Sequence, residues 1–359
     1  MDSSLSLRMT FHLVTYFVTT TKFWYTDIRP AVSGAYAENV LMSTLFSTEH
    51  LGQLLTHHLK IDINAVTITP VGATGPGDFF LAQSNQGNFI LRLFPADDAP
   101  HLFFEKTSLR QLPALHALIR AKTSVPVPEI IAHDFSRTLI ARDFLILEAK
   151  TGVSLKQIEK INHRQYNKVL HQLGKSLRQL HAVTGQNYGY ANFPLQESPS
   201  SYRQTFGLLW QRLIGDVVRA GVYTSQDADH LTRLWQRHQA QFNRHAPPCL
   251  LQMNMCAEHF LVDEEANLVA ILDFSQAMWG DPELDFAVAD YYGVYASAFW
   301  QGYGQPRPND PASQIRRRFY LMYEIQKHIP VSIWRDKSPA DAKQAKQMVL
   351  TIADNIPEP

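Results

Sequence analysis

Three polar side chains in the C-terminal half of the chain are spaced so that they could act together. Asn254 and His259 lie in a polar segment before a predicted strand at 260–262, and Asp273 follows a second predicted strand at 268–272. Two strands joined by a short acidic turn form a hairpin, which brings its two ends together. We therefore expect the amide, the imidazole and the carboxylate to surround one cleft, where such groups can bind a metal ion or position a reacting group.

This stretch resembles the catalytic core of the aminoglycoside phosphotransferase and choline kinase family, which is distantly related to the protein kinases. The usual pattern of that family is His-Gly-Asp, four residues, Asn, a hairpin, and then Asp followed by Trp or Phe. Here the spacing is kept, but Gln252, Met253 and Asn254 occupy the His-Gly-Asp positions. His259 occupies the position of the metal-binding Asn, and Asp273 matches the metal-binding aspartate.

The resemblance covers residues 50 to about 335 and implies an α+β, two-lobed, protein-kinase-like fold. It places a small N-terminal lobe with an antiparallel sheet at 48–148 and a larger, mainly helical lobe at 149–359, with residues 1–47 as an extension outside the family. It also implies ATP and Mg²⁺ as cofactors. The expected partners are the nucleotide and an unidentified small-molecule acceptor.

A glycine-rich turn is expected in the smaller lobe. Three strands are predicted there, at residues 66–71, 79–84 and 89–94. Between the first two, Gly72, Gly75 and Gly77 resemble the glycine-rich hairpin of a kinase, in which backbone amides approach the nucleotide phosphates without interference from Cβ atoms. A plain hairpin turn explains the same glycines equally well.

Further nucleotide-binding positions follow from the resemblance. Arg92 in the third strand and Glu105 on the next predicted helix, from Glu105 to Arg120, resemble the kinase pair in which a carboxylate holds the phosphate-binding basic residue. A surface ion pair is the alternative. A strand ending near Glu148 matches the hinge between the lobes, where the backbone of residues 148–150 would meet an adenine edge.

The altered residues put the chemistry of the loop in question. Asn254 stands at the position of the catalytic base and cannot take up a proton, although its amide oxygen could position a hydroxyl. Imidazole suits zinc, copper or iron better than magnesium, so Asp273 is the clear magnesium ligand and His259 an unusual one. Three functions therefore compete: a small-molecule kinase impaired by these replacements, a pseudokinase that binds nucleotide or another ligand, and a protein-interaction scaffold.

The composition narrows the choice of partners. The chain has 359 residues, of which 45% are hydrophobic and 18% charged, and 33 basic residues balance 33 acidic ones. A net charge of zero gives no overall attraction to nucleic acid or to a membrane surface, so neither is expected as a partner. The apolar stretch at 9–25 is interrupted by polar residues and is too short to cross a membrane.

The cysteine content predicts the compartment. Cys249 and Cys256 are the only two cysteines, which is too few for a disulfide framework, so a reducing, cytoplasmic setting is expected. A signal peptide within the first 37 residues is the minority alternative, because a polar, charged segment separates the apolar run from a small-residue site.

Overall fold

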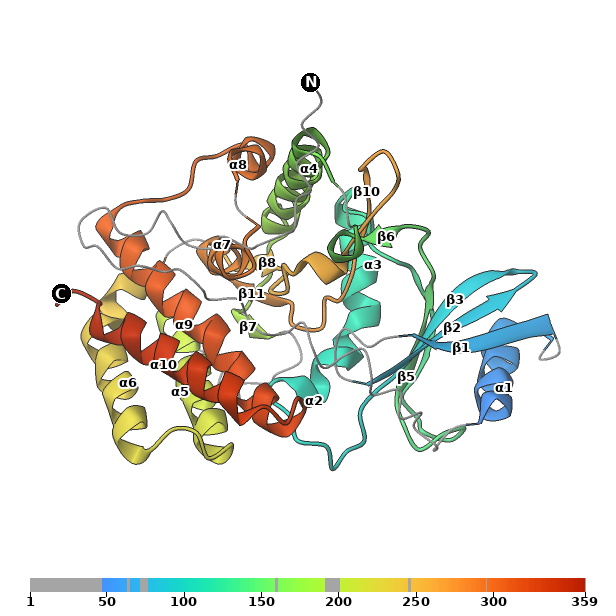
Figure 1. Cartoon of the computed structure of the whole chain (residues 1–359), viewed down its shortest axis with the longest axis horizontal. Coiled ribbons are helices and arrows are strands. Elements are labelled where there is room, and N and C mark those ends of the chain that lie inside the picture. The colour runs from blue at the N-terminus through green and yellow to red at the C-terminus, as the bar shows by residue number, and fades with distance from the viewer. Residues whose placement is uncertain are drawn as a thin grey trace, which may run out of the picture.

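The computed structural model describes residues 47–62, 65–71, 77–158, 161–190, 201–244, 247–294 and 296–358. They form a five-stranded antiparallel sheet with a helix packed against it, beside a larger body of helices (Figure 1). This is the two-lobed α+β arrangement that the sequence predicts. Gly72, Gly75 and the predicted extension up to residue 46 lie outside the described residues.

The sheet of the smaller lobe has the strand order β1-β2-β3-β5-β4, with every neighbouring pair antiparallel. Its elements are α1 (Thr48–Leu59), β1 (Val66–Val71), β2 (Asp78–Ser84), β3 (Gly87–Leu93), β4 (Ile130–Asp134) and β5 (Phe144–Glu148). Leucines spaced three and four apart give α1 an apolar stripe, and Leu51, Leu54 and Leu55 are buried in one cluster with sheet residues. The three strands predicted at residues 66–71, 79–84 and 89–94 are confirmed to within a few residues.

The helix predicted from Glu105 to Arg120 is interrupted. It consists of α2, a 3₁₀ turn and α3, at Glu105–Ser108, Leu109–Gln111 and Leu112–Lys122. Pro113 lies in the first turn of α3. Backbone N–H groups there have no acceptor within the helix, so a proline, which lacks this group, loses no hydrogen bond. In one continuous helix its ring would clash with the carbonyl of Leu109, so the prediction of a single helix was wrong.

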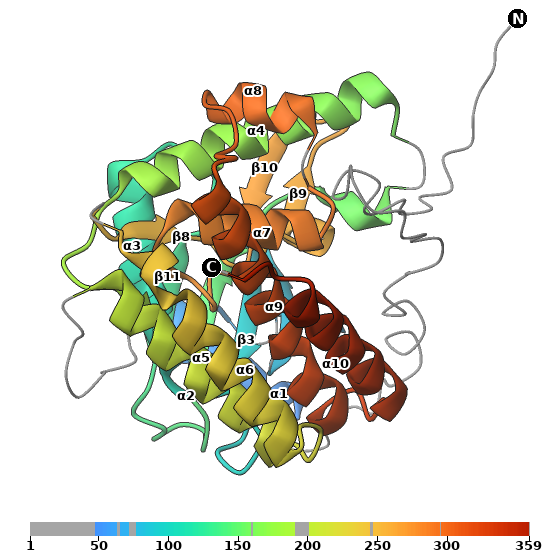
Figure 2. The same cartoon turned by 90° about the vertical axis from the view of Figure 1, so that its left-hand side faces the viewer.

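The larger lobe is built from seven α-helices in the described part of the chain. They are α4 (His163–Ala182), α5 (Tyr202–Arg219), α6 (Ser225–His238), α7 (Pro282–Tyr291), α8 (Ser297–Tyr303), α9 (Pro311–Trp334) and α10 (Pro339–Asp354), with 3₁₀ turns at Leu155–Gln157, Gln239–Phe242 and Ala257–His259. Helices α4 and α8 lie side by side, as do α9 and α10 (Figures 1 and 2). The first contact requires Gly174, because a Cβ there would lie 2.1 Å from the carbonyl oxygen of Phe299.

Two small sheets place the residues of the cleft. Their strands are β6 (Val153–Ser154), β7 (Gly189–Tyr190), β8 (Cys249–Leu251), β9 (Phe260–Val262), β10 (Leu268–Ile271) and β11 (Met278–Gly280), in the orders β10-β9-β6 and β7-β11-β8. The predicted hairpin is confirmed as β9 and β10, with Ile271 opposite Phe260. The Asp263 carboxylate closes its turn by accepting the backbone N–H of Asn267 at 2.7 Å.

The hydrophobic core does not divide at the predicted domain boundary. The small cluster under the sheet includes α1, whereas Phe94, Leu112 and Val127, which precede Glu148, belong to the main cluster of the helical lobe. The boundary at 148 stays a prediction. No helix in the described ranges combines the length and the hydropathy that a membrane span requires.

Candidate active site

The 252–259 loop joins β8 to β9 and is held from behind by Asp285 of α7. The Asp285 carboxylate is fully buried and accepts the backbone N–H groups of Gln252 and Met253, both at 2.8 Å. Nε2 of His181 lies 3.0 Å from the same carboxylate. Met253, which stands where the family has glycine, has a φ of +63°, a strained conformation for a residue with a side chain. These bonds fix the path of the loop backbone.

Asp273 follows β10, and its buried carboxylate lies among Arg92, Asn254 and His259. Its Oδ1 accepts hydrogen bonds from Arg92 Nη1 at 3.1 Å and from the backbone N–H of Ser275 at 3.2 Å. Its Oδ2 accepts one from Asn254 Nδ2 at 3.3 Å. Burial raises the pKa of Asp273, but the charges of Arg92 and His259 and these hydrogen bonds outweigh burial and lower the pKa to about 2. Asp273 is therefore an anion at neutral pH.

Arg92 on β3 reaches across to this carboxylate from the smaller lobe. Arg92 is 4% exposed, and its guanidinium lies over the ring of Phe79, 4.9 Å from the ring centroid. Nη1 bonds Asp273, whereas Nε and Nη2 have no hydrogen-bond partner among the described residues. An unpaired buried N–H costs about 1–3 kcal/mol, so buried donors in native proteins almost always have an acceptor. The two unused donors indicate a place for a bound acceptor.

Asn254 directs its amide nitrogen, rather than its oxygen, into the cleft. Its Nδ2 donates to Asp273, and its Oδ1 faces the thiol of Cys256 at 3.7 Å. Burial, followed by the charges of Glu258 and Asp273, raises the pKa of Cys256 well above its usual value, so the thiol keeps its proton and can donate it. The Asp273 carboxylate thus accepts the NH₂ group of Asn254, and the role of the amide oxygen in positioning a hydroxyl stays a prediction.

His259 ends the 3₁₀ turn before β9 and is 2% exposed. Its Nδ1 lies 3.3 Å from the carbonyl oxygen of Asn254 and 2.9 Å from Cys256 Sγ. Its Nε2 faces Asp273 Oδ2 at 4.0 Å and has no hydrogen-bond partner in the described structure. The structure therefore brings together Asn254, His259 and Asp273, as the sequence predicts, and adds Arg92 to them.

The predicted pair between Arg92 and Glu105 is not formed. Glu105 instead pairs with Arg335, which follows the end of α9, with Nη1 of Arg335 3.0 Å from Oε1. Its Oε2 also accepts the backbone N–H of Leu102 at 2.8 Å. Because α2 is a single short turn that begins at Glu105, its carboxylate turns toward the helical lobe, and Asp273 takes the place of the predicted partner.

Gly77 is required by the local path of the chain. Its φ is +107°, and a Cβ there would lie 2.1 Å from the carbonyl oxygen of Leu93 on β3. This close backbone approach is enough to demand glycine, so the residue type carries no separate sign of a nucleotide. Its predicted phosphate-facing role stays a prediction.

The backbone around Glu148 is already partly engaged. The N–H of Glu148 donates to the carbonyl oxygen of Glu129 at 2.9 Å, and that of Ala149 donates to Asn88 at 3.1 Å. The Glu148 side chain pairs with Lys150 at 2.7 Å. Both amides are therefore engaged within the protein, and the contact of residues 148–150 with an adenine edge stays a prediction.

Sequence reasoning missed two residues of the site, Cys256 and Ser275. Cys256 lies three residues before His259. Because a 3₁₀ turn has three residues per turn, it brings these two side chains into contact. Ser275 lies two residues after Asp273, where the left-handed φ of +51° at the aspartate turns the chain back on its own carboxylate. Small polar residues this close to a predicted ligand are the signal that could have found them.

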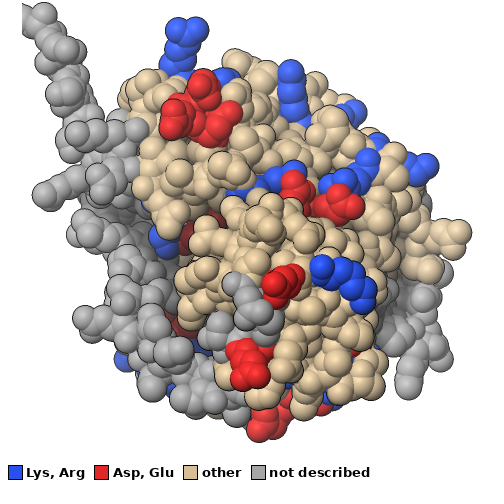
Figure 3. All heavy atoms as spheres, turned by 90° about the vertical axis from the view of Figure 1, so that its right-hand side faces the viewer, with Lys and Arg blue, Asp and Glu red and all other residues tan. Residues whose placement is uncertain are grey.

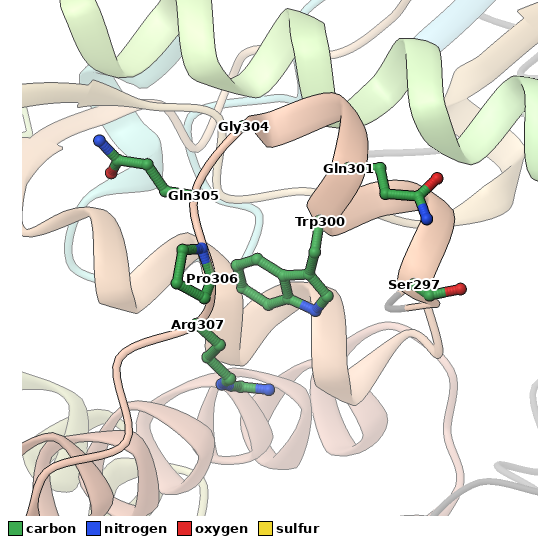
Figure 4. Close-up of a pocket in the computed structure, with 7 residues that line it drawn as sticks. All are labelled: Ser297, Trp300, Gln301, Gly304, Gln305, Pro306 and Arg307. Atoms are coloured by element: carbon green, nitrogen blue, oxygen red, sulfur yellow. The ribbon is translucent and has the colours of Figure 1, made fainter.

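Two regions of the described surface lie apart from this cluster of residues. On the face toward the five-stranded sheet, acidic and basic side chains are intermixed on a largely uncharged surface (Figure 3). A hollow of about 630 Å³ near α8, where Trp300 lies beside Pro306, contains none of the predicted site residues (Figure 4). Arg307 at its edge is paired with Asp290, with Nη1 2.7 Å from Oδ1.

Comparison with known proteins decides the family. The model of the APH phosphotransferase enzyme family matches residues 67–320, which contain every described element of the cleft. The chain belongs to this family. Over 269 residues it is 26% identical to a "Probable ketoamine kinase" of Vibrio cholerae serotype O1, an alignment that covers 70% of this chain and 87% of that protein.

Solved structures agree on the fold of this phosphotransferase-family chain. A "putative fructosamine-3-kinase" from Thermobifida fusca matches with a TM-score of 0.64 at 12% identity, covering 86% of this chain and 98% of the other. The streptomycin–ATP–APH(2″)-IIa ternary complex matches with a TM-score of 0.57 at 15% identity, covering 84% and 95%. The predicted protein-kinase-like fold and family are thus confirmed.

Proposed function

We propose that this chain binds ATP in the cleft between β3 and the 252–259 loop and transfers its γ-phosphoryl group to a hydroxyl or amine of a small molecule. The observation that carries the proposal is Arg92, a buried guanidinium with one nitrogen on Asp273 and two donors without partners. The family match supports phosphoryl transfer as the reaction class.

Phosphate oxygens are the acceptors that suit Arg92. Guanidinium groups present donors in a planar fork that matches phosphate, and their bonds to an anion are stronger than those to a neutral acceptor. Asp273 keeps its negative charge beside the guanidinium, so a divalent cation is needed to neutralise the repulsion between this carboxylate and the phosphates. Asp273 is the proposed carboxylate ligand of that cation, for which the resemblance predicts Mg²⁺.

The proposed acceptor is a ketoamine. Support comes from the Vibrio cholerae relative, which shares 26% identity over most of its length with this chain. Helices α5 and α6, which lie within the region from Ser201 to Phe242 that the family resemblance assigns to the acceptor pocket, would supply the acceptor contacts. In the transfer itself the acceptor oxygen attacks the γ-phosphorus, the bond from this phosphorus to the β–γ bridging oxygen breaks, ADP leaves, and the hydroxyl proton passes to water.

Transfer is expected to be slow because Asn254 cannot receive that proton. Positioning and charge account for most of the catalysis of phosphoryl transfer, so loss of the base lowers the rate without abolishing it. A nucleotide-binding module without turnover is the second candidate, and the bond from Asn254 Nδ2 to Asp273 favours it, because it ties the loop to the cation ligand.

Analysis of the reaction product distinguishes the kinase from the nucleotide-binding module. The chain is incubated with ATP, a divalent cation and glycated lysine, and phosphorylated acceptor is measured by mass spectrometry. Slow turnover that rises at least tenfold in the variant carrying both Asn254→Asp and His259→Asn supports the kinase. Tight nucleotide binding with no product in either protein supports the binding module, and absence of both binding and product overturns the proposal.

A reducing, cytoplasmic setting belongs to the same proposal. Cys249 and Cys256 are both free thiols in the structure. ATP and a protonated thiol within the cleft are both compatible with such a compartment.

A further inference from the structure

A buried ion pair on α9 contacts the segment that follows Asp273. Its members, Glu324 and Lys327, have side chains that are 1% and 4% exposed, and Nζ of Lys327 lies 2.5 Å from Oε2 of Glu324. Burial raises the pKa of Glu324, but the charge of Lys327, with smaller contributions from His328, outweighs burial and lowers the pKa. Glu324 is therefore ionised at neutral pH, and Lys327 balances its charge. Apolar side chains often stabilise a fold as well as a buried ion pair does, so stability alone does not account for this pair.

Lys327 fixes the orientation of Gln276, which lies three residues after Asp273. Nζ of Lys327 donates to Oε1 of Gln276 at 2.6 Å. An ammonium group can only donate, so the carboxamide oxygen must face it and the NH₂ group must point away. Gln276 is partly exposed, and its Nε2 donates no hydrogen bond within the described part of the chain. Two N–H donors are therefore presented close to the proposed cation ligand.

Tyr292, which directly follows α7, contacts the same ion pair. Its hydroxyl lies 3.5 Å from Oε1 of Glu324 and 3.3 Å from Nε2 of His328. Hydrogen bonds of a hydroxyl to oxygen are usually about 2.7–2.8 Å long, so this hydroxyl is loosely held. Burial, followed by the charge of Glu324, raises the pKa of Tyr292 well above its usual value, and Glu258 in the 252–259 loop acts in the same direction. The phenol thus keeps its hydrogen and lies within range of a charge on that loop.

We propose that Gln276 and Tyr292 bind hydroxyl groups of the acceptor beside Asp273 and thereby select an uncharged, hydroxylated group, such as the sugar chain of a ketoamine. The inference rests on the proposed function and adds two residues outside α5 and α6 to the acceptor contacts. An amide NH₂ donates and a phenol oxygen accepts, which matches a hydroxyl group that does both. The charges of the ion pair beneath them cancel, so neither an anion nor a cation is favoured at this place.

Two substitutions remove the proposed contacts with little other change. Gln276→Glu keeps the length of the side chain and an acceptor for Lys327, but it replaces both N–H donors by a carboxylate oxygen. Tyr292→Phe removes only the hydroxyl. Gln236→Glu is the matched control, because it makes the same chemical change at an exposed position of α6.

The test measures acceptor binding and does not require turnover. The full chain is saturated with a non-hydrolysable ATP analogue and a divalent cation, and glycated lysine is titrated into it by calorimetry. Lysine without the sugar is the second probe. The affinity for the ATP analogue and the midpoint of thermal unfolding are measured separately for each protein.

The affinity for glycated lysine should fall about tenfold or more in Gln276→Glu and in Tyr292→Phe, because each leaves a hydroxyl of the sugar without its partner. Gln236→Glu should bind like the unmodified chain, and nucleotide affinity and the unfolding midpoint should be the same in all four proteins. Lysine without the sugar should bind at least about tenfold more weakly than glycated lysine to the unmodified chain.

Equal binding of glycated lysine to all four proteins overturns the inference and leaves the proposed function standing. A parallel loss of nucleotide affinity in the two variants also overturns the inference, because it shows that these residues only support the shape of the cleft. Nucleotide binding without binding of glycated lysine, or equal binding of lysine with and without the sugar, overturns the selection of a sugar and leaves nucleotide binding intact. Absence of nucleotide binding overturns both the inference and the proposed function.

Discussion

Two buried carboxylates lie on opposite sides of the 252–259 loop and differ in how they are satisfied. Asp285, behind the loop, accepts two backbone N–H groups and contacts His181, and these groups are all supplied by the protein. Asp273, in front of the loop, is surrounded by atoms that lack partners, namely Nε and Nη2 of Arg92 and Nε2 of His259. A satisfied network points to a structural role, and unsatisfied polar atoms point to a missing ligand.

The residue types depart from the family pattern on both sides, since Gln252 and Met253, whose amides Asp285 accepts, occupy its His and Gly positions. Behind the loop, Asp285 compensates for the positive φ of Met253 by bonding its amide. In front of the loop, Asn254 and His259 have replaced a base and an oxygen ligand. The backbone geometry of a phosphotransferase loop can therefore persist while the groups that it presents change.

The largest effect is expected behind the loop. Asp285→Asn replaces a carboxylate that accepts two backbone N–H groups by an amide, which leaves one of these N–H groups without a good acceptor. The substitution should therefore lower the free energy of unfolding by about 3–5 kcal/mol. Urea unfolding measures this. Asp229→Asn, at an exposed position on α6, is the matched control and should change stability by less than about 0.5 kcal/mol. Equal effects of the two substitutions would contradict the structural role of Asp285.

In front of the loop, the effect should be on binding. Arg92→Lys keeps the positive charge beside Asp273 but removes the planar fork, so ATP affinity should fall about 10- to 100-fold while stability changes little. Isothermal titration calorimetry measures the affinity. Arg120→Lys, on an exposed pair with Glu129, is the control. Unchanged affinity in Arg92→Lys would show that the two free donors do not meet phosphate.

The pH dependence of stability gives a smaller effect. Because the folded pKa of Asp273 is about 2 and the usual value is near 4, its ionisation stabilises the fold by about 2 kcal/mol at neutral pH. This contribution is fully present above the unfolded pKa and is lost as the pH falls through the folded one. Relative to Asp273→Asn, the stability advantage of the unmodified chain should therefore fall to about half between pH 7 and pH 3, measured by urea unfolding. An advantage that does not change with pH would contradict the depressed pKa.

The smallest effect concerns the partner of Glu105. A double-mutant cycle between Glu105→Gln and Arg335→Gln should give a coupling energy of about 0.5–1 kcal/mol, since the pair is partly exposed. A double-mutant cycle between Glu105→Gln and Arg92→Lys should give a coupling energy near zero. Coupling to Arg92 that exceeds coupling to Arg335 would restore the pairing predicted from the sequence.

The sequence predicted the elements better than the contacts between them. Two short apolar runs separated by an acidic turn specify the β9–β10 hairpin locally, so it could be predicted from the sequence. Pro113 can either start a helix or break one, and the choice depends on packing that the sequence does not display. Arg92 is as compatible with Glu105 as with Asp273 in the sequence, and the fold brings Asp273 to it across 181 positions of the chain. The bonds of Asp285 to the loop amides join residues 32 and 33 positions apart, a contact that only the fold creates.

The central claim is that a nucleotide and a divalent cation bind together in front of Asp273. The most direct test is calorimetric titration of the purified chain with ATP, with and without a divalent cation, repeated on Asp273→Asn. The account predicts that the cation strengthens ATP binding at least tenfold in the unmodified chain and has no such effect in the variant. Failure to bind ATP under any condition, or an equal effect of the cation in both proteins, would contradict it.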